Sequence, residues 1–368
     1  MPTLTKGSRS RGPFVFALEA LAIAAGIVAA AARPSPAWIE SAFSNGYYPR
    51  WERGWAALAH GLPFALGDLV GLSVLALLVA RAIVMMRRAR RDRWKALGRF
   101  VLDAGAVAGI VAFWFYAGWG WGYDRAPLET RTAYAPARIG KPMTDTLRAR
   151  AMREINRLAP AAHAENARSA PGSWRPELFA SWLPVVRRLG DTWQPRVNAA
   201  KPSLAGPYLE LSGVSGFINP FTLESSLAPD LLWFELPFSQ AHEWSHDAGF
   251  NREDEANYIG IISCLRDRDP VARYSGWLEL FFYLPPLPHY SKDMFVPLVW
   301  QDFTALRERN ARHVNLTLSR FSWHVYDRYL TANHVASGVQ NYNEVTRLLA
   351  GIPLDAAGLP IARDEKRQ

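Results

Sequence analysis

The chain has 368 residues, of which 49% are hydrophobic and 20% are charged. The high apolar content excludes intrinsic disorder, and a single cysteine, Cys264, excludes a disulfide scaffold. We interpret Cys264 as a small buried apolar residue rather than a nucleophile. The length suggests two or three structural units.

The positive charge is concentrated near the N-terminus. Residues 1–122 contain 14 Lys+Arg and 6 Asp+Glu, which gives +8 of the total net charge of +9. Residues 123–368 contain 28 Lys+Arg and 27 Asp+Glu, which gives the remaining +1. A large domain this close to neutrality has no overall attraction for a polyanion, so we exclude nucleic acid as a partner.

Three apolar stretches predict transmembrane helices at about residues 14–32, 62–86 and 102–123. A helix needs about 20 predominantly apolar residues to cross the hydrocarbon core of a bilayer, and each stretch meets that length. Three such stretches in a row beside basic flanks favour membrane spans over core helices of a soluble protein. The first stretch also has features of a signal peptide, ending in Ala30-Ala31-Ala32. We favour a retained helix, and cleavage would leave the orientation unchanged.

Basic residues indicate which way the spans point, because they favour the cytoplasmic side. Lys6, Arg9 and Arg11 precede the first span, and seven basic residues lie within Arg87–Arg99, between the second and third spans. The N-terminus and the second loop are therefore predicted to be cytoplasmic, and everything after Tyr123 extracytoplasmic. Arg87–Arg99 could alternatively bind nucleic acid, but its position between two spans favours contact with lipid headgroups.

Residues 124–368 form the second predicted unit, after a membrane anchor at 1–123, and are long enough for one sizeable core. Helical spacing of apolar residues dominates this unit, which predicts a mainly α (α+β) domain. Its apolar segment 277–284 is interpreted as a core helix, with a membrane-facing or peptide-binding surface as the alternative. The other expected elements are a linker at 124–142, helices at 144–158, 176–189, 292–317 and 319–333, a loop at 160–175, strands or a hairpin at 208–227, helices from 238 onward broken at Gly249 and Pro285-Pro286, and a frayed tail at 363–368.

The segment His242-Glu243-Trp244-Ser245-His246 is an H-E-x-x-H motif. On a helix, positions i and i+4 share a face, so both imidazoles can bind one metal ion. Zinc makes a bound water acidic enough to attack a carbonyl near neutral pH. Glu243 is placed to take the proton of that water and pass it to the leaving amine. The motif therefore predicts a zinc-dependent hydrolase with Glu243 as the general base.

Two glutamates are candidates for the third metal ligand. Gly249, three residues after His246, predicts the end of the motif helix. Glu253-Asp254-Glu255-Ala256-Asn257 then opens an apolar helix, whose first turn we expect to face the two histidines. Either Glu253 or Glu255 could complete the site on this pattern alone.

The arrangement resembles the gluzincin pattern, in which H-E-x-x-H is followed by E-x-x-x-D or E-x-x-A-N. The resemblance implies that Glu253 is the zinc ligand and that Asn257, four residues later, orients a ligand. The gap between the two parts is shorter here than in gluzincins, which keeps Glu255 as the alternative. The short gap also resembles the metzincin turn, but this chain has no third histidine there.

The wider chain resembles a family of bacterial membrane proteins named only as domain of unknown function number 3810. The resemblance covers most of the chain and implies a metallopeptidase-like protein without an established substrate, so it supports zinc and topology more than any reaction. Taking it together with the motif and the basic loops, we expect a protein of the bacterial inner (cytoplasmic) membrane with a periplasmic zincin-like domain, Zn²⁺ as cofactor, and membrane lipid and a peptide or protein substrate as partners. In addition to the zinc motif, the family resemblance rests on the segments Trp119–Tyr123, Val214–Thr222, Arg273–Gly276 and Gly338–Tyr342.

Stabilising the oxyanion in such a site needs a further hydrogen-bond donor, and Tyr274, His324, Tyr326 and Tyr342 are the candidates. The leading hypothesis is a membrane-anchored zinc metallopeptidase, a hydrolase of the cell envelope. The alternative is a non-catalytic zinc-containing envelope protein that serves in binding or assembly. A metal-dependent hydrolase of another amide, such as a cell-wall amide, is a third hypothesis. Glu243 favours catalysis, because a purely structural zinc site gains nothing from a general base.

Overall fold

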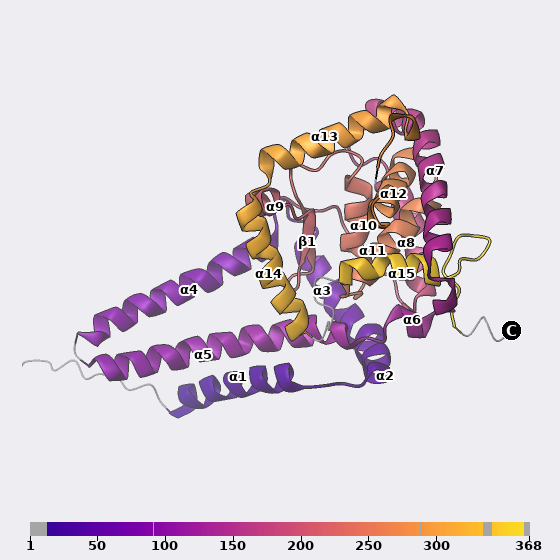
Figure 1. Ribbon diagram of the computed structural model, residues 1–368. Coiled ribbons are helices and arrows are strands. Elements are labelled where there is room, and N and C mark those ends of the chain that lie inside the picture. The colour runs from indigo at the N-terminus through magenta and orange to yellow at the C-terminus, as the bar shows by residue number, and fades with distance from the viewer. Residues whose placement is uncertain (1–12, 91, 288, 334–340, 364–368) are drawn as a thin grey trace, which may run out of the picture. The chain divides into compact units, whose positions relative to one another are not determined.

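The computed structural model describes residues 13–90, 92–287, 289–333 and 341–363 (Figure 1). The chain forms two compact units. Unit 1 contains the residues up to Arg33 together with Asp68–Trp119, and unit 2 contains Pro34–Gly67 and the chain from Gly120 onward.

Unit 1 is built from the helices α1 (Pro13–Ala31), α4 (Leu66–Ala89) and α5 (Arg93–Gly118), each long and apolar enough to cross a membrane. This confirms the predicted number of apolar helices. Helix α5 begins well before the predicted residue 102, because Asp92 caps it by accepting a hydrogen bond of 3.1 Å from the backbone N–H of Lys95. Helices α1 and α5 pack closely at glycines, since a Cβ on Gly26 would lie 2.5 Å from the carbonyl oxygen of Gly109.

Residues 34–67 belong to unit 2 rather than to the helices on either side of them. This loop contains α2 (Pro36–Trp38), a π-helix η1 (Ile39–Tyr47) and α3 (Tyr48–Ala59). Ile39 and Tyr48 are fully buried, and the Tyr48 hydroxyl donates a 3.0 Å hydrogen bond to the backbone carbonyl of Asp247. The compact units therefore differ from the predicted division at residue 123, because Ile39, Phe43 and Tyr48 of this loop are buried in unit 2.

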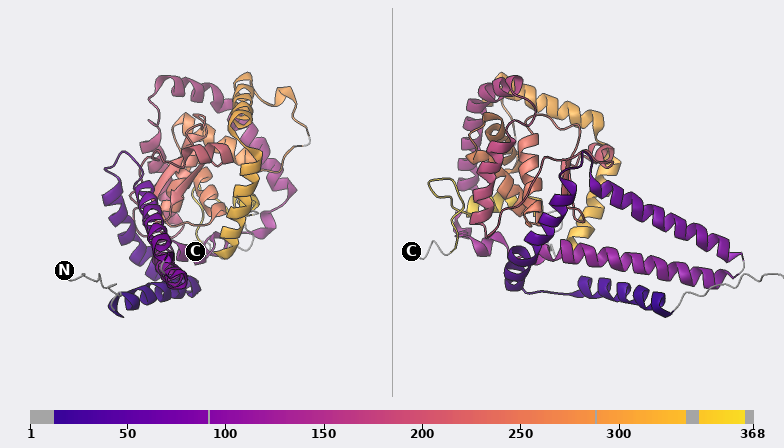
Figure 2. Two further views of the ribbon diagram at one scale, coloured as in Figure 1. Left: turned by 90° about the vertical axis from the view of Figure 1, so that its left-hand side faces the viewer. Right: turned by 180° about the vertical axis from the view of Figure 1, so that it is seen from behind.

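The rest of unit 2 is mainly helical with one two-stranded antiparallel hairpin, in which Gly216 pairs with Leu227 and Asn219 with Glu224 (Figures 1 and 2). Its elements in chain order are η2 (Gly120–Asp124), α6 (Leu128–Arg131), η3 (Pro136–Arg138), α7 (Lys141–Arg168), α8 (Arg175–Arg188), α9 (Gly206–Ser212), β1 (Gly216–Asn219), β2 (Glu224–Leu227), α10 (Leu236–Asp247), α11 (Glu253–Arg266), α12 (Pro270–Tyr283), η4 (Lys292–Met294), α13 (Pro297–His313), α14 (Leu316–Ala332) and α15 (Asn341–Gly351).

Helix α11 is the centre of the core of unit 2. Its residues from Glu253 to Cys264 are all buried, and α8, α10, α12 and α15 pack around it. Cys264 is fully buried, as the sequence predicted. The apolar segment 277–284 lies in α12 and at its end, and most of its side chains are buried in the same core, as expected for a core helix.

Most expected elements of unit 2 are present, and three differ. The breaks at Gly249 and before Pro285-Pro286 are confirmed. The hairpin is present over 216–227 only, because the beginning of the expected segment, residues 208–212, belongs to helix α9. Helix α7, however, continues through Pro160 into the predicted loop, because Ala159 and Ala162 lie on its buried face beside Ile155. The linker at 124–142 contains α6 and η3 rather than extended chain only, since Leu128 is fully buried. Residues 364–368 of the tail lie outside the described residues.

Candidate metal centre

A tight turn between α10 and α11 brings the motif histidines to the start of the following helix. Gly249 has a φ of +86°, a conformation that suits glycine, and its N–H donates to the carbonyl of His246 at 2.8 Å. The N–H of Phe250 donates to the carbonyl of Ser245 at 3.1 Å, which closes the end of α10. The chain therefore reverses direction, and α11 begins at Glu253 beside the histidines.

Two imidazole nitrogens and one carboxylate converge on a single point. The Nε2 atoms of His242 and His246 are 3.1 Å apart. Glu253 Oε2 lies 3.3 Å from Nε2 of His242, and Glu253 Oε1 lies 3.6 Å from Nε2 of His246. One potential ligand atom from each residue lies within 4.8 Å of the others. The structure thus brings together the three residues that the sequence proposed as ligands.

The hydrogen bond at Nδ1 of His246 leaves Nε2 as the ring atom available to a metal ion. Its Nδ1 lies 2.8 Å from the carbonyl oxygen of Phe250, which can only accept a hydrogen bond. In the neutral ring the proton is therefore on Nδ1, and the lone pair of Nε2 points at Nε2 of His242. Two nitrogens and a carboxylate oxygen that face one another can share a proton or a metal ion, and histidine nitrogen with carboxylate oxygen is a donor set that suits zinc.

The charges at the site are strongly coupled. Burial opposes a charge on His246, but the Glu253 carboxylate outweighs it and raises the pKa of His246 to about 9. Burial likewise disfavours the Glu253 anion, and the two histidines nevertheless hold its pKa well below the usual value. The anionic form of Glu253 thus requires positive charge from its neighbours, which a divalent cation would supply.

Glu243 lies on the same helix with its carboxyl group buried. Burial raises the pKa of Glu243 to about 7, although both histidines oppose the shift. Among the described residues its Oε2 atom has no hydrogen-bond partner, as a carboxylate oxygen that receives a water would. A Cβ on Gly216 of β1 would lie 2.8 Å from Glu243 Oε1, so the hairpin packs directly on this carboxyl group and a glycine is needed there.

Glu255, the alternative third ligand, is used elsewhere. Its Oε1 accepts a 3.0 Å hydrogen bond from the backbone N–H of Leu128, and its Oε2 lies 3.3 Å from Nη2 of Arg131. Asn257 lies one helical turn after Glu253 and is buried, and its side chain interacts with Tyr283. The geometry therefore favours Glu253 over Glu255 as the third ligand.

Of the four candidate oxyanion donors, the structure brings Tyr326 to the site. Its hydroxyl, from α14, donates a hydrogen bond to Glu253 Oε1. Tyr274 is buried elsewhere and donates to Asp302 Oδ2 at 2.5 Å, and His324 is exposed on α14. Tyr342, like part of the segment Gly338–Tyr342, has a side chain outside the described residues.

Two residues at the site were missed by the sequence reasoning. Phe250 fixes the ring of His246 through its backbone carbonyl, and Arg125 lies over the Phe250 ring with its guanidinium carbon 4.5 Å from the ring centroid. Arg125 also forms a buried ion pair of 2.9 Å with Asp191 and a bidentate pair with Glu40 of the 34–67 loop. A backbone carbonyl has no signature in side-chain spacing, and pairs this distant in sequence follow no local pattern.

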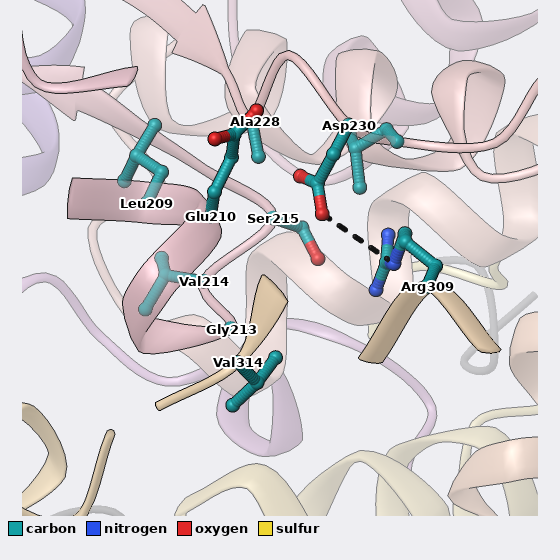
Figure 3. Close-up of a pocket in the computed structure, with 10 residues that line it drawn as sticks. Leu209, Glu210, Gly213, Val214, Ser215, Ala228, Asp230, Arg309 and Val314 are labelled. Carbon is teal, nitrogen blue, oxygen red and sulfur yellow. Dashed lines mark ion pairs between the residues drawn. The ribbon is translucent and has the colours of Figure 1, made fainter. Parts of the chain in front are cut away.

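A small pocket lies where α9, the residues before β1 and α13 meet (Figure 3). Arg309 on one side lies 3.8 Å from Asp230 and makes two hydrogen bonds of 2.7 and 2.9 Å to Glu235, so its charge is balanced within the fold. Val214 and Ser215 line the pocket immediately before Gly216. The pocket therefore borders the hairpin that packs on Glu243.

Comparison with known proteins gives a family and no closer relative. No curated protein and no solved structure matches the chain. The model of the family described as "Protein of unknown function (DUF3810)" matches residues 43–350, which include the residues of the candidate metal centre. Because this match covers most of the chain, the protein belongs to the DUF3810 family.

Proposed function

We propose that the protein is a membrane-anchored zinc metallopeptidase that hydrolyses peptide bonds outside the cytoplasm. The observation that carries the proposal is the convergence of His242, His246 and Glu253, together with the buried carboxyl group of Glu243, whose Oε2 has no hydrogen-bond partner among the described residues. The ligands are the three convergent residues, and Glu243 is the general base. The pattern of ligands and base is that of the gluzincin type.

A bound zinc ion would lower the pKa of a water and polarise the substrate carbonyl. Side chains and backbone of the protein transfer the protons and orient the ligands. Glu243 accepts the proton on its carboxylate and donates it to the leaving amine, and its pKa of about 7 suits both transfers near neutral pH. Phe250 holds the ring of His246 in the tautomer that leaves Nε2 free to bind. Tyr326 orients the Glu253 carboxylate by donating to Oε1.

The alternative function is a non-catalytic zinc-containing envelope protein that binds or assembles other components. The placement of Glu243 favours catalysis, because a structural zinc site has no use for a buried carboxylate beside the ligands. Hydrolysis of another amide, such as one in the cell wall, would use the same groups. Cleavage of members of a broad peptide library would support peptide hydrolysis over both of these alternatives.

Zinc binding is the first test. Purified full-length protein should contain one zinc ion per chain, and His246→Ala or Glu253→Ala should lose it. His324→Ala is the matched control, because His324 is exposed on α14 and should leave the zinc content unchanged. Metal analysis of the four proteins decides the question, and full zinc occupancy in His246→Ala would sink the proposed site.

The orientation is the second test. The basic residues of Arg87–Arg99 lie at the end of α4, in the short link after it and in the first turns of α5, and basic residues beside membrane spans favour the cytoplasmic side. A reporter that is active only outside the cytoplasm should therefore be active when it is fused after Gln368. A second fusion with a reporter active only in the cytoplasm should be silent, and the reverse pattern would place the candidate site inside the cell.

A further inference from the structure

Helix α14 has an outward face that combines apolar and basic side chains. Leu316 is 68% exposed, Phe321 64% and Val325 49%. Arg320, His324 and Arg328 are exposed between them, spaced at one helical turn. The only acidic residue of the helix, Asp327, is less exposed than these residues.

Helix α9 extends this apolar surface. The two helices are in contact, since the Tyr208 hydroxyl donates to Ser322 Oγ at 2.9 Å and the N–H of Asn315 donates to the carbonyl of Leu211 at 2.8 Å. We call the exposed side of these two helices, with Leu204 directly before α9, the α9–α14 surface. Its exposed apolar residues are Leu204, Tyr208, Leu211, Leu316, Phe321 and Val325.

Within unit 2, the segments that lead into the apolar helices contact α14 or β2. Tyr123, in the segment that directly follows α5, has its hydroxyl 3.2 Å from the hydroxyl of Tyr329 at the end of α14. At the start of α4, the N–H groups of Leu66 and Gly67 donate to the Glu224 carboxylate at 3.0 and 2.9 Å. Glu224 begins β2, and β2 contacts α9. Both junctions therefore lie on elements that touch α9 or α14.

We propose that the α9–α14 surface rests on the lipid headgroup layer, with Phe321 and Val325 inserted among the lipids and Arg320 and Arg328 paired with anionic headgroups. Apolar residues beside basic ones on the exposed face of a helix are typical of helices that lie in the membrane interface. Anionic lipid attracts such basic side chains. Helix α14, all of which is described, has no acidic residue that is classed as exposed. This favours anionic lipid as the partner over a protein surface of mixed charge.

The same helix reaches the candidate metal centre from its other face. Tyr326, which contacts Glu253, points inward, whereas Phe321 and Val325 point outward. Lipid contact would therefore hold the helix that carries Tyr326. The lipid contact itself requires neither zinc nor hydrolysis, so its test is independent of the proposed function.

The test uses the full chain in vesicles of phosphatidylethanolamine and phosphatidylglycerol. Phe321→Cys and Val325→Cys are each labelled with an environment-sensitive fluorophore, and the only natural cysteine, Cys264, is fully buried and should not react. A nitroxide near the lipid headgroup is the quencher. The control is Ala149→Cys, because Ala149 is exposed on α7 and α7 lies on the opposite side of unit 2 from α14 (Figure 1).

Lipid quenching at positions 321 and 325 should be several-fold stronger than at position 149, and Arg320→Glu with Arg328→Glu should weaken it. Quenching by aqueous iodide instead of lipid would overturn the proposal and show a solvent-exposed surface. Protection from both quenchers would also overturn it, since a second copy of the chain would then cover the helix. Loss of zinc through His246→Ala should leave the lipid quenching unchanged.

Discussion

Replacing Glu243 by Gln is expected to reduce peptide hydrolysis by a factor of about 10²–10⁴, the usual contribution of a general base. Gln has the shape of Glu, so the zinc ligands and the packing against Gly216 should be preserved. It cannot accept a proton from zinc-bound water, so the nucleophile forms without assistance. The measurement is kcat/KM on substrates selected from a broad peptide library, together with zinc content and thermal stability.

Glu308→Gln on α13 is the matched control, because it makes the same chemical change at an exposed position. Its activity should equal that of the unchanged protein. The Glu243→Gln variant should bind substrate without cleaving it, so capture by this variant would identify the substrate. Equal activity in both variants would contradict the general-base role. If neither variant hydrolyses peptides and both restore function to cells that lack the gene for this protein, the binding or assembly function replaces the peptidase function.

The parts of the fold that the sequence predicted are those set by local pattern. Three apolar helices follow from length and composition alone. The turn at Gly249 follows from the conformational freedom of glycine after a helix. The histidines of the motif share a face because four residues separate them. These features need no knowledge of distant contacts, so they could be read from the chain.

Features that depend on tertiary contacts were not predictable in this way. Glu253 and Glu255 both lie in the first turn of α11, and their tertiary contacts separate them. Glu253 faces the two histidines of the motif, whereas Glu255 contacts Leu128 and Arg131. Pro160 favours a break, yet packing of the neighbouring alanines keeps α7 intact. The loop at 34–67 was grouped with the spans by position, whereas its contacts place it in unit 2.

The second large effect that we expect is a loss of stability when Arg125, which binds Glu40 of the 34–67 loop, is replaced. The side chain of Arg125 is 2% exposed, and its guanidinium binds both oxygens of Glu40 at 2.8 Å and Asp191 at 2.9 Å. Burial raises the pKa of Asp191 to about 6 even with Arg125 beside it. The positive charge of Arg125 therefore stabilises the anionic forms of two carboxylates, one of them buried. Arg125 also connects the 34–67 loop with Phe250, because its guanidinium lies over the Phe250 ring.

Arg125→Met should destabilise the protein by about 3–5 kcal/mol, because removing one partner leaves buried charges uncompensated. Arg168→Met is the control, since Arg168 forms a similar 2.7 Å pair with Glu165 but is 71% exposed, and it should cost less than about 1 kcal/mol. Arg125→Lys keeps the charge and loses the bidentate geometry, so it should fall between the two. Chemical unfolding of the full chain in detergent measures all three. Zinc binding should also weaken in Arg125→Met, because Phe250 orients His246. Equal unfolding of Arg125→Met and Arg168→Met would show that the buried network does not hold the loop in unit 2.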